Sequence, residues 1–534
     1  MKKLARGMAA LLAAALLAGC APASTNETSG TTDQESSAAT SVTADGSSVI
    51  RVGINADPAS FGPFESGGNG KNATYRTLYE PLAEYQGVGG EVAGVIAKSW
   101  EQTGDLTYQV TIWDNVYDTA GNHMTASDIA FTYNSMKETG NFTDLRYMDS
   151  CTVVDDYTVE FVMNSDIIGL FEKVLQASRC VTQAAYEASP DEMATTPVGT
   201  TAYELTEYIS GSEYVFEKTD SYWQTEENFS DYQYANVDRI EYYYIAEASQ
   251  LAIALESGTV DMVNGLPYTE SQRFMEGGSN AEGFTVFEDL QNLSQVLFFQ
   301  CSENSPCSNE KLRQAILYAI DLQGLLDGAA NGQGLVCATF GGNMFSDYDS
   351  DWENEALYTY DLEKAKQLLA ESGFDTSTKL RIVLNGDSTR KSIAQIIQGY
   401  LTQIGISVEI NSYEDSLFNT YKSDETAYDI LLDNCGGSDY LMTIWRGKFD
   451  IAAYTTGGTI NGVYDDTLQE LIEACEYDNS KENMDAFHTY LYEHAYAIGL
   501  FNAQMYTVCT DNVLEVSMDG KQFPCVASCV YSWN

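Results

Sequence analysis

Residues 108–133 read YQVTIWDNVYDTAGNHMTASDIAFTY, and this stretch decides how the folded part of the chain is organised. Apolar and polar residues alternate from Tyr108 to Trp113, which predicts a half-buried strand. Thr125 stands where the N-cap of a helix over 127–137 is expected. A second alternating run follows at 157–162. The stretch therefore predicts a small α+β unit in which strands pack with one helix.

Strand and helix patterns recur on both sides of this unit. Strands are expected at 49–54, within 203–216, and at 239–245, 260–263, 380–384 and 407–410, and helices at 73–82, 249–256, 311–319, 362–371 and 391–405. Strands that alternate with helices at this spacing pair in parallel through right-handed crossovers. The chain is therefore predicted to be α/β with mixed sheets.

The N-terminus has the pattern of an export signal. Residues 1–6 carry only positive charge and lead into an apolar run at 8–17, which is too short to span a bilayer and is typical of a signal peptide. The sequence from Leu17 to Cys20 resembles the lipobox of bacterial lipoproteins. The resemblance implies that 1–19 is removed, that Cys20 is lipidated, and that the chain is anchored to the outer face of the cytoplasmic membrane, which is periplasmic in a Gram-negative cell. An ordinary secretory signal with an incidental cysteine is the alternative.

The composition limits the partners of the mature chain. Residues 20–48 are rich in Ser, Thr, Ala, Gly and acidic residues, so they are expected to form a disordered tether. The whole chain has 78 acidic and 27 basic residues and a formal charge of −51. Such a charge repels phosphate backbones, which excludes nucleic acid as a partner. Charge alone does not name a ligand.

No catalytic or metal-binding pattern stands out. The three histidines, His123, His488 and His494, form no HExxH motif, and neither a GxSxG elbow nor a strand-linked GxGxxG occurs. The run GGNGKN at 67–72 lacks the spacing of a phosphate-binding loop and is expected to be a flexible loop. We expect no enzyme activity, no cofactor and no metal. Because carboxylates are abundant, an exported hydrolase remains the alternative of a different class.

The chain has eleven cysteines, ten of them after Cys20. An even number in an exported chain permits disulfides without requiring them. Cys301 and Cys307 flank a short loop that contains Ser305 and Pro306, so they are the expected local pair. In an organism that lives without oxygen, all ten thiols would stay reduced.

Several separated blocks, taken together, resemble one family. The stretch 108–133 and the blocks that follow it are similar, in the same order, to the oligopeptide- and dipeptide-binding family of extracellular solute-binding proteins (family 5), the receptor lipoproteins of ABC importers. The resemblance covers 49–534. The further blocks are Gly199 to Tyr203, Tyr222-Trp223, Val237 to Ile240, Leu255 to Asp261, Leu312 to Asp321 and Ala365 to Phe374.

The resemblance implies a two-lobed, hinged fold of the periplasmic-binding-protein type with an extra small domain. Lobe I would comprise 49–85, 196–292 and 497–534, the extra α+β domain 86–195, and lobe II 293–496. A solute would bind between the lobes and favour their closure. It also implies a monomer that captures short peptides and passes them to permease subunits. Oligosaccharides are the alternative solute, and the scarcity of histidine argues against the nickel complexes that some members bind.

The resemblance further implies which residues bind the solute. In peptide-binding members, an aspartate after a strand holds the α-ammonium group of the peptide, and Asp439 matches it, with a turn residue in a Gly-rich loop as the alternative. Asp433 is the substitute if the loop has slipped. Trp445 would stack on the solute or, alternatively, belong to the core. The other candidates are Asn434, Tyr440, Asn292, Ser294, Phe501 and Gln504.

Overall fold

The computed structural model describes residues 47–65, 67–85, 91–177, 179–225, 235–337, 345, 347–354, 358–436, 440–454 and 459–533. The predicted signal peptide, Cys20, nearly all of the predicted tether, and Asp439 lie outside the described residues. Among the helices that are described, none has both the length and the apolar character of a membrane span.

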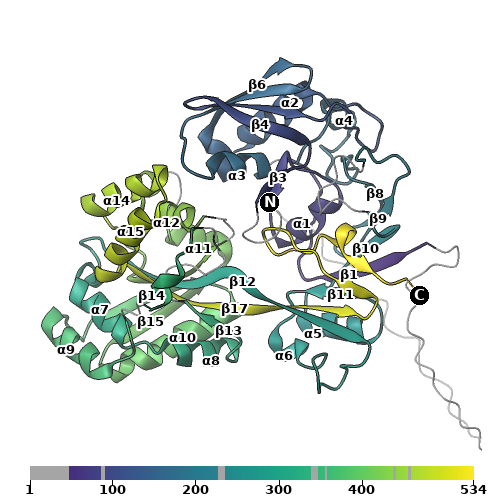
Figure 1. Ribbon diagram of the computed structural model, residues 1–534. Helices are drawn as coiled ribbons and strands as arrows, with labels where there is room; N and C mark the ends of the chain where they lie inside the picture. Colours follow the sequence, from purple (N-terminus) through teal and green to yellow (C-terminus); the bar gives the residue numbers. More distant parts are fainter. Residues whose placement is uncertain are drawn as a thin grey trace, which may run out of the picture. The chain divides into compact units, whose positions relative to one another are not determined.

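A large mixed sheet runs through the described part of the chain (Figure 1). Its strands, in spatial order, are β15 (Ser407–Tyr413), β14 (Lys379–Asn385), β16 (Ile430–Gly436), β12 (Phe284–Phe299), β17 (Ala497–Thr510), β11 (Met262–Asn264), β1 (Val49–Ile54), β10 (Arg239–Tyr244), β9 (Glu213–Lys218) and β8 (Tyr203–Ile209), and β13 (Gly334–Val336) pairs with β17. Strand β1 is parallel to β10 and β11, and β14 is parallel to β15 and β16, whereas β12 and β17 are antiparallel to each other. The predicted α/β class with mixed sheets is confirmed.

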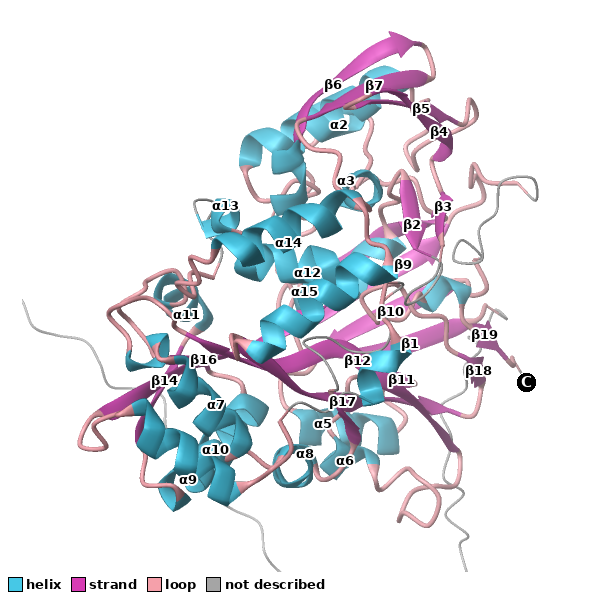
Figure 2. Ribbon diagram, turned by 60° about the vertical axis from the view of Figure 1, so that its left-hand side comes forward, coloured by secondary structure: helices cyan, strands magenta, loops and turns pink. Residues whose placement is uncertain are grey.

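Helices divide this sheet into two lobes. We call β1, β8, β9, β10 and β11 with their helices lobe I, and β13, β14, β15 and β16 with theirs lobe II. The long strands β12 and β17 lie side by side and belong to both (Figure 2). The elements of lobe I are α1 (Asn69–Thr74), η1 (Tyr75–Thr77), α5 (Ala248–Glu256), α6 (Tyr268–Ser271) and, near the C-terminus, β18 (Val513–Glu515), η5 (Val526–Ser528) and β19 (Val530–Tyr531).

In lobe II, two groups of helices cover the two faces of the sheet (Figures 1 and 2). One group contains α11 (Asp415–Tyr421), α12 (Leu441–Phe449), α13 (Ile451–Tyr454), α14 (Asp466–Tyr477) and α15 (Lys481–Glu493). The other contains η3 (Pro306–Ser308), α7 (Glu310–Tyr318), α8 (Leu322–Ala330), α9 (Leu362–Ser372) and α10 (Ser388–Gln403). The short η4 (Ser350–Asn354) packs on the first group, where Trp352 stacks on His488 of α15. Between them, the buried parts of β12 and β16 build a continuous apolar core.

The stretch quoted first supplies one strand and one helix to a separate unit that is built on an antiparallel sheet. Its strands follow the order β4 (Ala97–Gly104), β5 (Thr107–Ile112), β7 (Thr158–Met163) and β6 (Met148–Asp155). Helix α2 (Ala126–Thr139) packs on it, and Thr125 caps this helix in a capping box with Asp128. The other elements of this small domain are β2 (Ala83–Tyr85), β3 (Val92–Gly94), η2 (Thr143–Tyr147), α3 (Leu170–Ala177) and α4 (Gln183–Ala188). The α+β unit predicted from 108–133 is confirmed.

Three local expectations are wrong. The helix expected at 73–82 does not form, since α1 ends at Thr74 and only the short η1 (Tyr75–Thr77) follows it. The run at 67–72 does not form a loop throughout, since α1 begins at Asn69. The ten cysteines after Cys20 all lie in described segments and none of them forms a disulfide, so Cys301 and Cys307 are not bridged. Hydrogen bonds hold their loop instead: Ser305 Oγ accepts from the backbone N–H of Cys307 at 3.2 Å and donates to Asp429 at 2.8 Å.

Candidate functional site

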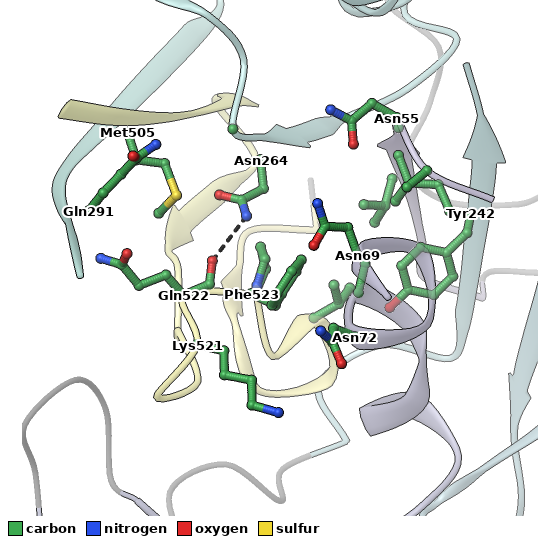
Figure 3. A pocket seen from close by; sticks show the side chains of 18 of the residues that line it. Asn55, Asn69, Asn72, Tyr242, Asn264, Gln291, Met505, Lys521, Gln522 and Phe523 are labelled. Carbon is green, nitrogen blue, oxygen red and sulfur yellow. Dashed lines mark hydrogen bonds between the residues drawn. The ribbon is translucent and has the colours of Figure 1, made fainter. Parts of the chain in front are cut away.

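A cavity of about 370 Å³ opens at the carboxyl ends of parallel strands of lobe I. Asn55 follows β1, and Asn264 ends β11, the strand beside it. The other walls come from α1, β10, β12, β17 and the C-terminal loop at 521–526 (Figure 3). The carboxyl ends of parallel strands are the usual place for a ligand in an open α/β sheet. This cavity is therefore the candidate solute site.

An irregularity in the long strands shapes one wall. The register between β12 and β17 shifts between Leu290 and Ser294, so residues 291–293 form no pairs with β17. Such a bulge turns side chains away from the regular ladder. Gln291, Asn292 and Leu293 all line the cavity. The crossover between the lobes thus contributes directly to the site.

The lining is rich in amides and contains one cation. Among the described residues that line the cavity, none is acidic, although the chain has 78 acidic residues. Lys521 provides the positive charge, while Leu293, Met505 and Phe523 add apolar surface. The amide side chains are those of Asn55, Asn69, Asn72, Asn264, Gln291, Asn292 and Gln522.

Three of these amides hold the walls together. Asn264 Nδ2 donates to the carbonyl of Gln522 at 3.0 Å, and its Oδ1 accepts from Thr507 at 2.7 Å (Figure 3). Gln522 Oε1 accepts from the backbone N–H of Asn292 at 2.9 Å, and Asn292 Nδ2 donates to the carbonyl of Gly520 at 2.8 Å. These bonds attach the C-terminal loop to β11 and β12.

The other four amides remain available. Within the described part of the chain, the side chains of Asn55, Asn69, Asn72 and Gln291 have no hydrogen-bond partner. Each offers two N–H donors and a carbonyl acceptor, and all four are at least partly exposed. They can bind a solute that presents alternating donors and acceptors.

The predicted crossover residues separate into two groups. Asn292 lines the cavity. Ser294 and Phe501 are fully buried, and Ser294 Oγ donates to Asn502 at 3.0 Å. Gln504 pairs with Leu290 in the long ladder and lies outside the lining. Their roles in binding stay predictions.

Asp433 lies in β16 of lobe II with its charge already balanced. Its carboxylate is 3.6 Å from Arg390 Nη1 and 3.5 Å from Lys448 Nζ. Burial alone would raise the pKa of Asp433, but Lys448, Lys422 and Arg390 hold it below its usual value. A ligand ammonium group at this carboxylate would therefore meet three cations.

The remaining lobe II candidates lie away from the cavity. Asn434 pairs with Gln295 across the β12–β16 ladder, and Tyr440 precedes α12. Trp445 is fully buried and stacks on Phe487 with ring centroids 4.6 Å apart, which favours the core alternative for this residue.

Sequence reasoning missed the free amides. Asn55 follows directly on the expected strand at 49–54, so the rule about carboxyl ends of strands could have found it. Asn69 and Asn72 lie in the run expected to be a loop. Gln291 carries no local signal, because its role depends on the register shift between two distant strands.

Comparison with known proteins assigns the chain to a family. The family described as bacterial extracellular solute-binding proteins, family 5 middle, matches residues 91–448. The nickel-binding protein NikA of Staphylococcus aureus is 22% identical over 70% of this chain and 71% of that protein. The dipeptide-binding protein of Escherichia coli is 23% identical over 67% of this chain and 70% of that protein.

A solved structure shows the same fold. The oligopeptide-binding protein AppA of Bacillus subtilis, solved with a nonapeptide, superposes with a TM-score of 0.71 at 19% identity, covering 91% of this chain and 99% of that one. The order of the sequence blocks, the two-lobed sheet and the family match lead to one conclusion. The chain belongs to the family 5 bacterial extracellular solute-binding proteins, the substrate-binding components of ABC importers.

Proposed function

We propose that this protein captures short peptides outside the cell and delivers them to the permease of an ABC importer. The four free amides around the lobe I cavity, at Asn55, Asn69, Asn72 and Gln291, carry this proposal. A peptide main chain presents N–H donors and carbonyl acceptors in alternation, and side-chain amides complement both. The E. coli relative named as a dipeptide-binding protein and the nonapeptide complex of AppA support the same solute class.

Capture would take place at the cell surface. The charged N-terminus, the apolar run and Leu17 to Cys20 support export and lipidation of Cys20. The tether would then let the two lobes reach the permease. The proposal involves binding and release of the solute as a monomer, without chemical conversion.

Oligosaccharides are the second candidate solute. The amide side chains of the cavity would bind sugar hydroxyl groups as well as they bind peptide groups. The absence of acidic residues from the described lining fits both classes.

Calorimetric titration of the mature protein separates the candidates. The protein is first stripped of bound solute by partial unfolding, and then titrated with di- to pentapeptides, with the same peptides N-acetylated, and with a panel of di- to tetrasaccharides. We expect binding of peptides and no binding of sugars. Loss of binding on acetylation would support capture of the ammonium group by an aspartate. Asp439 is the first candidate, because Arg390, Lys448 and Lys422 already surround Asp433. Sugar binding without peptide binding would overturn the peptide assignment.

A further inference from the structure

A second cavity, of about 250 Å³, adjoins the candidate site. Asn72 and Lys521 line both cavities. The second cavity lies where η1 of lobe I and the C-terminal loop meet the small domain, which contributes Asn141, Phe142, Asp144, Gln176, Ala177 and Arg179. A third space, of about 110 Å³, is also lined by Lys521. The side chain of this lysine thus lies where three spaces meet.

The two arginines of the second cavity are already engaged. Arg76 forms ion pairs with the buried carboxylates of Glu84 and Asp519, the latter at 2.6 Å. Arg179 Nη1 donates to the carbonyls of Pro63 and Glu65, both at 3.1 Å. These bonds hold the walls of the second cavity together.

The carboxylate closest to Lys521 in sequence is engaged as well. Asp519 Oδ2 accepts from Arg76, and Asp519 Oδ1 accepts from the backbone N–H groups of Lys521 and Phe523 at 2.8 and 2.7 Å. The carboxylate of Asp144 is the other acid that lines the cavity. Among the described residues no ion pair joins it to Lys521, although its charge acts to raise the pKa of that lysine.

The ammonium group of Lys521 therefore has no partner among the described residues. Among the residues that the structure describes, no side chain forms a hydrogen bond or an ion pair with it. The side chain is accessible to solvent, but protein groups surround it. The protein groups around the ammonium displace part of its water, which lowers the pKa of Lys521. Repulsion from Arg76 and Arg179 acts in the same direction, whereas Asp519 and Asp144 act to raise the pKa.

We infer that Lys521 binds a carboxylate of the solute, which the second cavity accommodates while the free amides hold the rest of the solute in the first. The inference rests on the proposed role as a solute receptor and specifies which solutes are preferred. A carboxylate at this point would make a charge-assisted hydrogen bond and relieve the repulsion from the two arginines. The described lining of the first cavity contains no acidic residue, and of the two acids of the second cavity Asp519 is already paired with Arg76.

The test compares three proteins and matched peptides. The mature wild-type protein, Lys521→Gln and the control Lys364→Gln, which removes an exposed lysine of α9, are titrated with a pentapeptide and its C-terminal amide. A second pair of peptides, both amidated, contains Glu or Gln at one position. The two pairs distinguish a C-terminal carboxylate from a side-chain carboxylate.

We expect Lys521→Gln to weaken binding of the preferred carboxylate peptide about tenfold, because the loss of one charge-assisted hydrogen bond has about this effect on affinity. Removal of that carboxylate should weaken binding to the wild type equally and have no further effect on Lys521→Gln, since the two changes delete the same contact. Lys364→Gln should bind like the wild type. Equal binding of carboxylate and amide peptides to the wild type and Lys521→Gln would overturn the inference.

A second measurement keeps the inference separate from the peptide assignment. Acetate, glutarate and N-acetylglutamate, at ionic strength matched with chloride, are tested for their effect on the melting temperature. If no peptide binds any variant, the peptide proposal fails. A carboxylate that then stabilises the wild type and Lys364→Gln, but not Lys521→Gln, would still support the subsite, and equal effects on all three would overturn it.

Discussion

The guanidinium Nη1 of Arg446 donates a hydrogen bond of 2.6 Å to the hydroxyl group of Tyr147, and so connects α12 of lobe II to η2 of the small domain. Arg446 also lies 5.0 Å from the centroid of the Tyr147 ring and forms an ion pair with Glu476. Beside this pair, the N–H of Ile168 donates to the carbonyl of Glu476 at 3.2 Å. A movement of lobe II away from the small domain must break these contacts.

We predict that Tyr147→Phe weakens solute binding about fivefold. The substitution keeps the ring and removes the acceptor of two charge-assisted bonds, one from Arg446 of lobe II and one from Arg146 of the small domain. The bond from Arg446 stabilises the closed state by about 1 kcal/mol. Calorimetry measures the affinity, and small-angle scattering measures the share of open molecules, which should rise. Tyr157→Phe is the control, because within the described residues its hydroxyl has no hydrogen-bond partner. Equal affinities of the two variants would show that the contact does not contribute to closure.

The two kinds of amide in the lobe I cavity should respond differently to substitution. Asn69→Ala and Gln291→Ala remove groups without partners in the described structure, so each should weaken solute binding about three- to tenfold and leave the urea midpoint unchanged. Asn264→Ala removes bonds to Gln522 and Thr507 and should lower the free energy of unfolding by about 1–2 kcal/mol. A stable Asn264→Ala protein, or an unstable Gln291→Ala protein, would contradict this division.

Local patterns were sufficient for most of the fold. Alternation at 108–113 and 157–162 corresponds to β5 and β7, and Thr125 caps α2 as expected. These features depend on neighbours in sequence, because a strand face or a helix cap involves residues only a few positions apart. Hydrophobic periodicity therefore predicted the elements, and the family resemblance predicted how they are arranged.

The site could not be predicted to the same extent. Gln291 faces the cavity because β12 and β17, far apart in sequence, shift register beside it. The balance of charge at Asp433 depends on Arg390 and Lys448, which come from two helices. Likewise, no sequence pattern shows that the side chain of Asn264 is hydrogen-bonded within the protein and that of Asn55, in the described structure, is not. Each of these properties arises from contacts between distant segments, which one sequence does not reveal.

The cysteines should behave as ten reduced thiols, nine of them buried and Cys301 half-buried. We predict that the mature protein with Cys20 substituted, unfolded without reductant, reacts with ten equivalents of a thiol reagent, and that the folded protein reacts slowly. Burial raises the pKa of Cys301 to about 11 and that of Cys435 to about 12, so little reactive thiolate is present at neutral pH. Eight equivalents after unfolding would indicate one disulfide, with Cys301 and Cys307 as the first pair to examine by mass spectrometry.

Glu80 is a buried carboxylate held by the Tyr222-Trp223 block. Tyr222 Oη and Trp223 Nε1 donate to its two oxygens at 2.6 and 2.8 Å, and Gln224 Nε2 donates at 3.0 Å. Burial raises the pKa of Glu80 from 4.5 to about 7, even though these hydrogen bonds act to lower it. The role of this block is therefore structural: it supplies donors to a carboxylate that has lost its water.

The raised pKa makes stability depend on pH in a defined direction. Between pH 4.5 and 7 the folded protein keeps the proton on Glu80 while the unfolded chain has lost it. The folded state binds more protons in this window, so the contribution of Glu80 to stability is fully present below pH 4.5 and is lost as the pH rises to 7. The loss is on the order of 3 kcal/mol. Because many other acids titrate in the same range, the wild type must be compared with a variant that lacks only this group.

We predict that Glu80→Gln removes the pH-dependent contribution of Glu80 to stability. Urea unfolding at pH 4.5, 5.5, 6.5 and 7.5 should show the wild type losing stability relative to Glu80→Gln as the pH rises. A difference in the free energy of unfolding that is the same at every pH reflects the altered hydrogen bonds to Trp223 and Tyr222. A difference that changes with pH reflects loss of the proton from Glu80. The control Glu101→Gln lies at an exposed position of β4, and its free energy of unfolding should vary with pH in parallel with that of the wild type. A Glu80→Gln curve that is also parallel to the wild type would mean that the carboxylate is already ionised throughout this range, and that Tyr222, Trp223 and Gln224 stabilise the charge more strongly than burial opposes it.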